Sequence, residues 1–235
     1  MQIPLRLTLS VLRCALVLVA HTVVAQGVAS ACSIGVRPAT AEEQRFYADA
    51  FATFQKAAPA APAGWTATDD IHPGASNGVL RELCARPNER VHHALFRRSY
   101  KLAGQEAAAR QAALERKLAA LMQEQQAATN AGKPVNWEAF DAAKAKAGAE
   151  FERDSSAEFG FSVGHERSIS DSFSPVPVPV GKGYRQAYAS SIGVPHQDLV
   201  IVLNPGTPAK SGLKVVTISG DPARVEALLK AATLR

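Results

Sequence analysis

The feature that most constrains the fold is the run of residues 105–129, which contains neither glycine nor proline. Leu114, Leu118 and Leu121 recur within it at spacings of four and three, and alanines fill many neighbouring positions. This periodicity predicts an α-helix about 36 Å long, which is longer than a small core needs.

A second helix is expected directly after the first. Residues 130–134, Asn-Ala-Gly-Lys-Pro, end the first helix, and Asn136 can cap a successor that runs to about Arg153. The apolar stripe of the successor comprises Trp137, Phe140, Ala143, Ala147 and Phe151. The two helices predict an antiparallel hairpin over residues 103–153. Its charges nearly cancel, which argues against a polyanion-binding arm.

In the segments on both sides of the hairpin, apolar residues recur with a period of two. Before them, Thr40 and Glu43 form a capping-box pattern that predicts a helix through about Lys56, and Asp221-Pro222 predicts a last helix. Strands are predicted over residues 65–68, 91–102, 158–173, 184–189, 199–203 and 213–219, with a proline-rich extended or edge segment over 175–180. Because strands follow one another without helices between them, we expect an α+β fold. It would comprise a mainly antiparallel sheet, an N-terminal helix, an inserted long helical hairpin and a C-terminal helix.

The amino terminus has the pattern of a secretory signal. Arg6 and Arg13 precede a short apolar run over residues 14–25, and small residues allow a cut after residue 25 or 31. A single α+β domain over 32–235 would remain, in which no segment approaches the roughly 20 apolar residues of a membrane-spanning helix. Ala31-Cys32 also resembles the cleavage box of bacterial lipoproteins. The sequence therefore predicts a periplasmic or secreted protein, with an outer-membrane lipoprotein anchored through Cys32 as the alternative.

Removal of the signal changes the charge and the cysteine count. Residues 1–31 contain Arg6 and Arg13 but no Asp or Glu, so the formal net charge falls from +5 to +3. Bulk charge of this size does not indicate a nucleic-acid-binding protein. Two cysteines remain, Cys32 and Cys84, which favours one disulfide in an oxidising compartment, with a free Cys84 thiol as the alternative.

A local excess of cations suggests an anion-binding patch. Its members are Arg81, Arg86, Arg90, Arg97, Arg98 and Lys101. The other interpretation is a solvated strand and loop, because strand alternation would send Arg97 and Arg98 to opposite faces.

Few residues suggest catalysis. The segment 160–164 matches G-x-S-x-G and makes Ser162, with His196 as its base, a weak nucleophile candidate. Large apolar and small residues alternate around Ser162, which indicates a continuous strand. The chemistry of a serine hydrolase needs a strand, a sharp turn and a helix instead. Asp69, Asp70 and His72 form a weak metal-ligand cluster. No glycine-rich phosphate loop is present, so no cofactor is expected.

The leading hypothesis is a non-enzymatic binding or structural module of a bacterial envelope. Its hairpin, or a sheet face, would contact an envelope protein or polymer of unknown identity. A small periplasmic hydrolase or metal-dependent enzyme is the alternative from another class. The hairpin could instead form a lid over the sheet, and exposed apolar side chains on the hairpin would distinguish a contact surface from a lid. The oligomeric state is left open.

Overall fold

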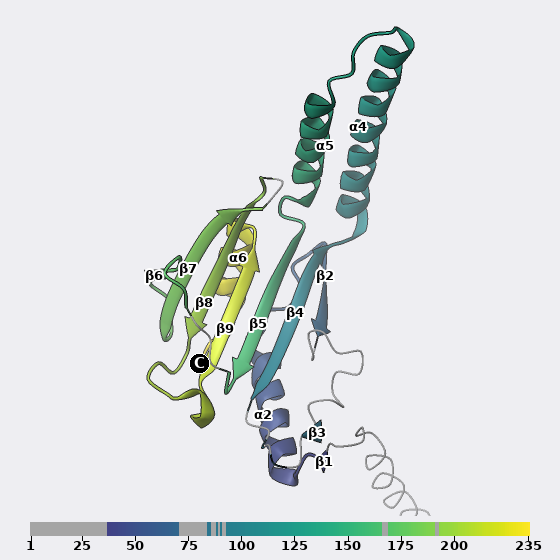
Figure 1. Ribbon diagram of the computed structural model, residues 1–235. Coiled ribbons are helices and arrows are strands. Elements are labelled where there is room, and N and C mark those ends of the chain that lie inside the picture. Colours follow the sequence, from purple (N-terminus) through teal and green to yellow (C-terminus); the bar gives the residue numbers. More distant parts are fainter. Residues whose placement is uncertain are drawn as a thin grey trace, which may run out of the picture.

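The computed structural model describes residues 37–70, 84–85, 88, 90, 93–165, 169–190 and 193–235. Its centre is a seven-stranded antiparallel sheet in the order β2-β4-β5-β9-β8-β7-β6 (Figure 1). The strands are β2 (Trp65–Asp70), β4 (Ala94–Leu102), β5 (Ser156–Val163), β6 (Ser174–Val176), β7 (Lys182–Ala189), β8 (Pro195–Val202) and β9 (Lys214–Gly220). A second sheet pairs β1 (Arg37–Pro38) with β3 (Cys84–Ala85). The predicted α+β class and antiparallel sheet are confirmed.

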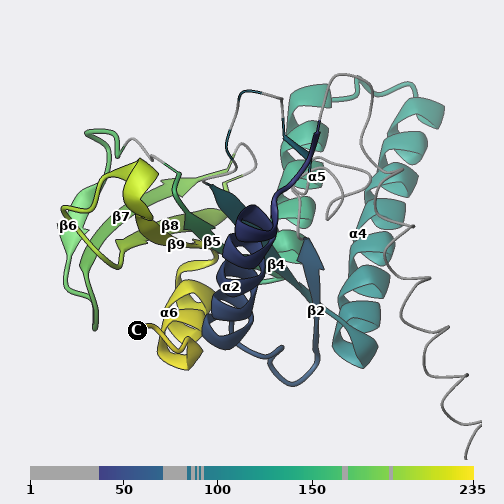
Figure 2. The same cartoon turned by 90° about the horizontal axis from the view of Figure 1, so that it is seen from below.

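Two helices cover one face of the large sheet. α2 (Ala41–Ala57) and α6 (Pro222–Ala231) lie on the same side of the strands (Figure 2). Alternate strand residues point toward these helices, because side chains along a strand alternate between faces. The core therefore consists of one parity of each central strand together with the apolar sides of α2 and α6.

An aromatic cluster joins α2 to the sheet. Phe96 of β4 is fully buried, and its ring centroid lies 5.2 Å from that of Tyr47, 5.4 Å from Phe51 and 5.5 Å from Phe54. Phe54 also reaches Phe159 of β5, with centroids 6.4 Å apart. Aromatic pairs at these separations contribute beyond their buried area, so the cluster fixes the position of α2.

Local signals set the starts of α2 and α6. Thr40 and Glu43 form the predicted capping box, and Arg37 adds a hydrogen bond of 2.7 Å to the Glu43 carboxylate. Asp221 caps α6 by accepting from the Ala223 amide, and Pro222 occupies the first turn. Both helix starts were predicted correctly because capping depends on residues that are close in sequence.

The long hairpin is an insertion between two neighbouring strands. α4 (Gly104–Asn130) follows β4, and α5 (Trp137–Glu152) leads into β5. Lys101 lies opposite Ser156 in the sheet, so the chain leaves and re-enters the sheet at one point. The hairpin extends away from the end of the sheet (Figure 1). It therefore does not cover a sheet face as a lid.

Several strand boundaries differ from the sequence predictions. The strand predicted over residues 158–173 ends at Val163, because Gly164 has a φ of 74° and turns the chain. β2 continues to Asp70, two residues beyond its predicted end. β8 begins at Pro195, four residues early, since pairing with β7 overrides the local turn signal. The β1–β3 pair was not predicted.

The β6 edge of the sheet is rich in proline. Pro175 lies in β6 and pairs with Tyr184, and Pro177 and Pro179 follow it. Proline lacks an amide proton, so it is tolerated mainly on an edge strand. The predicted edge position of this segment is confirmed. Within the described part of the chain, no helix is long and apolar enough to cross a membrane.

A hydrogen-bonded network lies between β4, β2 and the segment after α2. The Arg98 guanidinium donates to both Asp69 carboxylate oxygens, at 2.6 and 2.8 Å, and to the carbonyl oxygens of Ala58 and Pro59. The Tyr100 hydroxyl donates to the Pro59 carbonyl at 2.8 Å. Burial raises the pKa of Tyr100 to about 12, despite the opposing effect of Arg98.

We predict that the fold loses stability above pH 10 through Tyr100. In the unfolded chain a tyrosine loses its proton near pH 10, whereas folded Tyr100 keeps it to about 12. The stabilisation is therefore complete below pH 10 and decreases as the pH rises to 12, by about 2–3 kcal/mol. Urea unfolding at pH 8 to 12 measures this change. Tyr100→Phe should lose about 1 kcal/mol at pH 8 through its missing hydrogen bond but have a flatter alkaline profile. Parallel profiles for the two proteins would contradict the prediction.

Candidate functional site

The α4–α5 hairpin is the part of the described chain that is least integrated into the core. Leu114, Leu118 and Leu121 of α4 are only half-buried, as are Phe140 and Phe151 of α5. Ala147 is the only buried residue on the two helices. Among the described elements, α4 and α5 contact mainly each other. The apolar seam therefore holds the hairpin together but does not attach it to the sheet.

Apolar side chains are exposed near the tip of the hairpin. Met122 is 63% exposed and Trp137 is 61% exposed, the highest values among the large hydrophobic residues that the structure describes. Trp137 packs only edge-on against Phe140, with ring centroids 6.1 Å apart. The sequence placed Trp137 in the internal stripe, but it lies beside the seam, where solvent reaches it. We call Met122 and Trp137 the tip patch.

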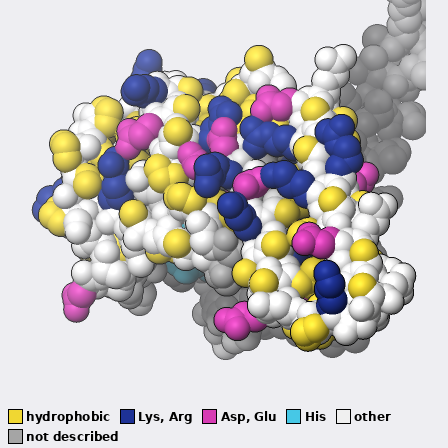
Figure 3. Space-filling model, turned by 90° about the horizontal axis from the view of Figure 1, so that it is seen from above, with side chains coloured by type: hydrophobic (Ala, Val, Ile, Leu, Met, Phe, Trp, Pro, Cys, Tyr) yellow, Lys and Arg dark blue, Asp and Glu magenta, His cyan; other side chains and the backbone are white. Residues whose placement is uncertain are grey.

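The charges of the hairpin are unevenly distributed along the sequence. Residues 118–143, which include the tip, carry Glu124, Glu138 and Asp141 but only Lys133, a net charge of −2. The flanking segments 104–117 and 144–153 together carry +2. Viewed from above, side chains of both signs are interspersed (Figure 3). The net charge of the whole hairpin is therefore near zero, although its outer half, residues 118–143, is acidic.

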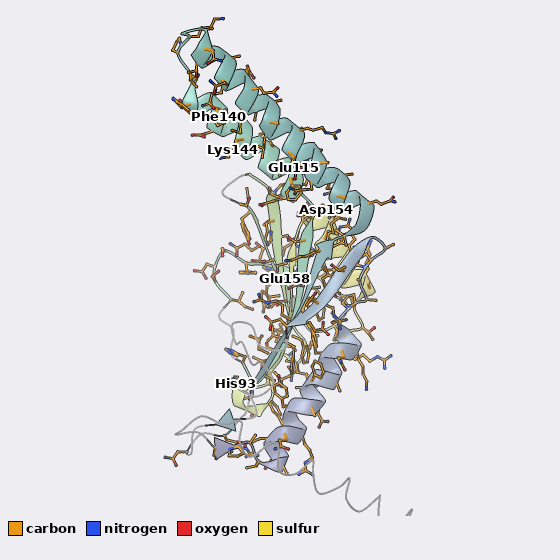
Figure 4. All side chains as sticks on the ribbon, turned by 90° about the vertical axis from the view of Figure 1, so that its right-hand side faces the viewer. His93, Glu115, Phe140, Lys144, Asp154 and Glu158 are labelled. Atoms are coloured by element: carbon orange, nitrogen blue, oxygen red, sulfur yellow. The ribbon has the colours of Figure 1, made fainter. Side chains whose placement is uncertain are left out.

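A cavity of about 720 Å³ lies where the hairpin meets the sheet. Its wall is of mixed character. The apolar lining residues are Leu102, Ala107, Ala108, Phe151, Val194 and Pro195, and the other ten lining residues are polar or charged. The cavity thus lies between the base of the hairpin and the turn that joins β7 to β8. Figure 4 shows Asp154 at this base and Phe140 far out along the hairpin.

Several charged groups around the cavity already have partners. Arg110 donates to Glu106 at 2.7 Å and to the Arg153 carbonyl at 2.7 Å. Asp154 pairs with Arg224, whose guanidinium lies 4.4 Å from the centroid of the Trp65 ring. The Arg110 contacts lie within the base of the hairpin, whereas the Asp154–Arg224 pair joins that base to α6 and, through Trp65, to β2. Exposed Lys101, half-buried His196 and the carboxylates of Glu152 and Asp221 also line the cavity.

His196 belongs to a small polar cluster on β7 and β8. Its ring lies 4.9 Å from the Tyr188 ring, and its Nε2 lies 3.7 Å from an Asp198 oxygen. Partial burial and the Asp198 carboxylate raise the pKa of Tyr188. Of these three residues, only His196 lines the cavity.

Ser162 lies far from His196. Ser162 is opposite Val215 of β9, and Val215 is opposite Val202 of β8, six residues along the strand from His196. At the rise of a β-strand this is about 20 Å, so the hydroxyl and the imidazole cannot exchange a proton directly. The G-x-S-x-G segment continues β5, as the alternation predicts, and does not form a nucleophile elbow.

The other predicted ligand residues also do not converge in the described chain. Asp69 points to the helix-covered face and pairs with Arg98, whereas Asp70, the next residue along β2, points to the opposite face. His72 and Cys32 lie outside the described residues, and for Cys84 only the backbone is described. The disulfide and the metal cluster therefore stay predictions from the sequence.

The described members of the predicted anion patch are spread over different surfaces. Arg90 pairs with Glu42 of α2, and Arg97 reaches Glu158 at 3.5 Å on the face without helices. Arg98 lies on the opposite face, as strand alternation requires. Lys101 lines the cavity. Arg81 and Arg86 lie outside the described residues.

Sequence reasoning missed one pair of histidines. The rings of His93 and His165 lie 5.6 Å apart, at the end of the sheet that is remote from the hairpin (Figure 4). The pairing of Ala94 with Val163 brings them together, and only that strand register could have indicated the contact. Among the described residues, no group of three or more His, Cys, Asp or Glu side chains is placed to hold a metal.

Comparisons of the chain with protein-family models, curated proteins and solved structures found no match. The site must therefore be interpreted from its own geometry. It comprises two exposed apolar side chains on the acidic outer half of the hairpin and a cavity of mixed polar and apolar lining at the base of the same hairpin.

Proposed function

We propose that the protein is an exported, non-enzymatic interaction module of a bacterial envelope that contacts another macromolecule through the α4–α5 hairpin. The observation that carries this proposal is the tip patch, two exposed apolar side chains on the outer half of a hairpin that packs mainly on itself. Exposed large hydrophobic side chains in a cluster are typical of contact surfaces. A hairpin that served only the core would turn these side chains inward.

We expect crosslinking through the tip patch in the native envelope. A photoreactive benzoylphenylalanine in place of Met122 or Trp137 should form adducts on irradiation of intact cells. The same residue in place of Lys56, which is exposed on α2, should form few. Gel mobility and mass spectrometry of the adducts measure the difference. Equal adduct yields at all three positions would remove the support for the hairpin as the contact element.

The export part of the proposal rests on the amino-terminal sequence. Residues 1–36 lie outside the described part of the structure. We predict that mass spectrometry of the mature protein detects an unmodified amino terminus at Gln26 or Cys32, since either follows a small-residue cleavage motif. An acylated Cys32 would instead establish the lipoprotein alternative, and an intact Met1 would argue against signal removal.

A second candidate function is small-molecule or hydrolytic chemistry in the basal cavity. The observation in its favour is His196, which lines the cavity and lies close to Tyr188 and Asp198. Ser162 of β5 offers no nucleophile there. Its level in the sheet corresponds to Val202 of β8, which lies six residues, or about 20 Å, from His196. The hairpin contact therefore stays the preferred function.

A further inference from the structure

Two histidines from distant parts of the chain meet at the end of the sheet that is remote from the hairpin. His93 directly precedes β4, and His165 follows β5 by two residues (Figure 4). Their ring centroids lie 5.6 Å apart, and the ring planes make an angle of 79°. Both side chains are exposed, so an ion in solution can reach them. Imidazole nitrogens are the commonest metal ligands among protein side chains, which makes this pair a candidate metal site.

The backbone next to both histidines is held in place by the sheet. Ala94, which follows His93, is opposite Val163 in the β4–β5 pair, and both residues are buried. Gly164 turns the chain with a φ of 74°, and its amide donates to the Leu213 carbonyl at 2.8 Å. The residue after this turn is His165. The two side chains are therefore attached to the ends of two central strands, which position ligands more precisely than long loops do.

The separation of the rings fits two imidazoles on one tetrahedral ion. A zinc–nitrogen bond of about 2.1 Å and about 1.1 Å from the nitrogen to the ring centre put each centroid about 3.2 Å from the ion. The two centroids are then about 5.2 Å apart at a tetrahedral angle and about 4.5 Å apart at a right angle. The 5.6 Å in the structure is closer to the tetrahedral value. Rotation of each ring about its Cβ–Cγ bond leaves the centroid almost in place, so the nitrogens can turn toward a shared ion without movement of the backbone.

From this geometry we propose that His93 and His165 together bind a divalent cation of the zinc type. The spacing favours an ion that accepts tetrahedral coordination by nitrogen, such as Zn²⁺, over the tetragonal arrangement that Cu²⁺ prefers. In the described part of the chain, no third His, Cys, Asp or Glu completes a metal-binding group with the pair. Structural zinc sites use four protein ligands, so a site with two leaves positions for water and holds an exchangeable ion. The site is separate from the proposed function, because it lies at the opposite end of the sheet from the hairpin.

Titration calorimetry of the purified chain with zinc chloride tests the site. The unmutated chain is expected to bind zinc, and His93→Ala and His165→Ala should each weaken that binding by about a hundredfold or more, because the second imidazole acts on an ion that the first already holds. His196→Ala is the matched control, since His196 is a partly exposed histidine at the hairpin end of the sheet, and it should bind zinc like the parent. An unmutated chain that does not bind zinc would overturn the proposal. Parental affinity in either His93→Ala or His165→Ala would overturn it too.

Thermal unfolding provides a second readout that does not depend on calorimetry. The two histidines are far apart in the sequence, so only the folded chain brings both rings to one ion. Zinc should therefore raise the melting temperature of the unmutated chain in a concentration-dependent manner, and this rise should be absent from His93→Ala and His165→Ala. In EDTA all three proteins should melt at nearly the same temperature, because both side chains are exposed, which shows that the variants are folded. Equal zinc-dependent shifts in the three proteins would place the ion elsewhere and overturn the proposal.

Discussion

Replacing Phe96 with alanine is expected to lower the free energy of unfolding by about 3–5 kcal/mol, the usual cost of truncating a buried phenylalanine. Phe96 is fully buried and contacts three aromatic residues of α2. Its loss would remove the transfer free energy of the ring and leave a cavity between β4 and α2. α2 makes its main contacts with β4 and β5, so its attachment should weaken most.

Urea unfolding monitored by far-ultraviolet circular dichroism measures this loss. Met122→Ala is the matched control, because Met122 is a large apolar residue that is 63% exposed. Its effect should stay within about 0.5 kcal/mol, as for other surface positions. Similar losses for the two variants would mean that the aromatic cluster does not hold the fold together.

The second large effect is expected from removing the hairpin altogether. Residues 104–153 can be replaced by a two-residue Asn-Gly turn, since Lys101 and Ser156 are already paired in adjacent strands. The shortened chain should fold with an unfolding free energy within about 1 kcal/mol of the parent, because the hairpin contributes little to the core and a shorter loop closes at lower entropic cost. On chemical crosslinking of intact cells, it should also lose the adducts that the parent chain forms through its hairpin.

Two measurements separate these outcomes. Cooperative urea unfolding of the shortened chain checks the independence of the sheet, and gel mobility of the crosslinked adducts checks the loss of the contact. Trp137→Ala retains the hairpin and therefore controls for the deletion. A shortened chain that unfolds without cooperativity would show that the hairpin supports the core. A shortened chain that still forms the same adducts would place the contact elsewhere.

Helices were predicted better than strand ends because their signals are local. The capping box at Thr40 and the cap at Asn136 lie within three residues of the amides that they bind. The extent of a strand depends on its neighbour: β8 gains four residues by pairing with β7, and β5 stops where Gly164 adopts a positive φ. The order of the seven strands depends on pairings between distant segments, which periodicity does not encode.

The candidate site was predicted in part. The hairpin and its unusual length followed from the absence of glycine and proline between residues 105 and 129. The exposure of Trp137 was missed, because an apolar residue at the edge of a helical stripe fits either the seam or the surface. The basal cavity was missed because its walls come from β4, both hairpin helices and the β7–β8 turn, which only the folded sheet brings together.

The prolines at positions 175, 177 and 179 also limit how this protein can polymerise. An open sheet margin is a template onto which a foreign strand can add by main-chain hydrogen bonds, the first step toward fibrils. At this margin the missing amide protons interrupt the donor pattern that such a strand would need. Copies at high local concentration are thereby discouraged from growing into a continuous ribbon along this side.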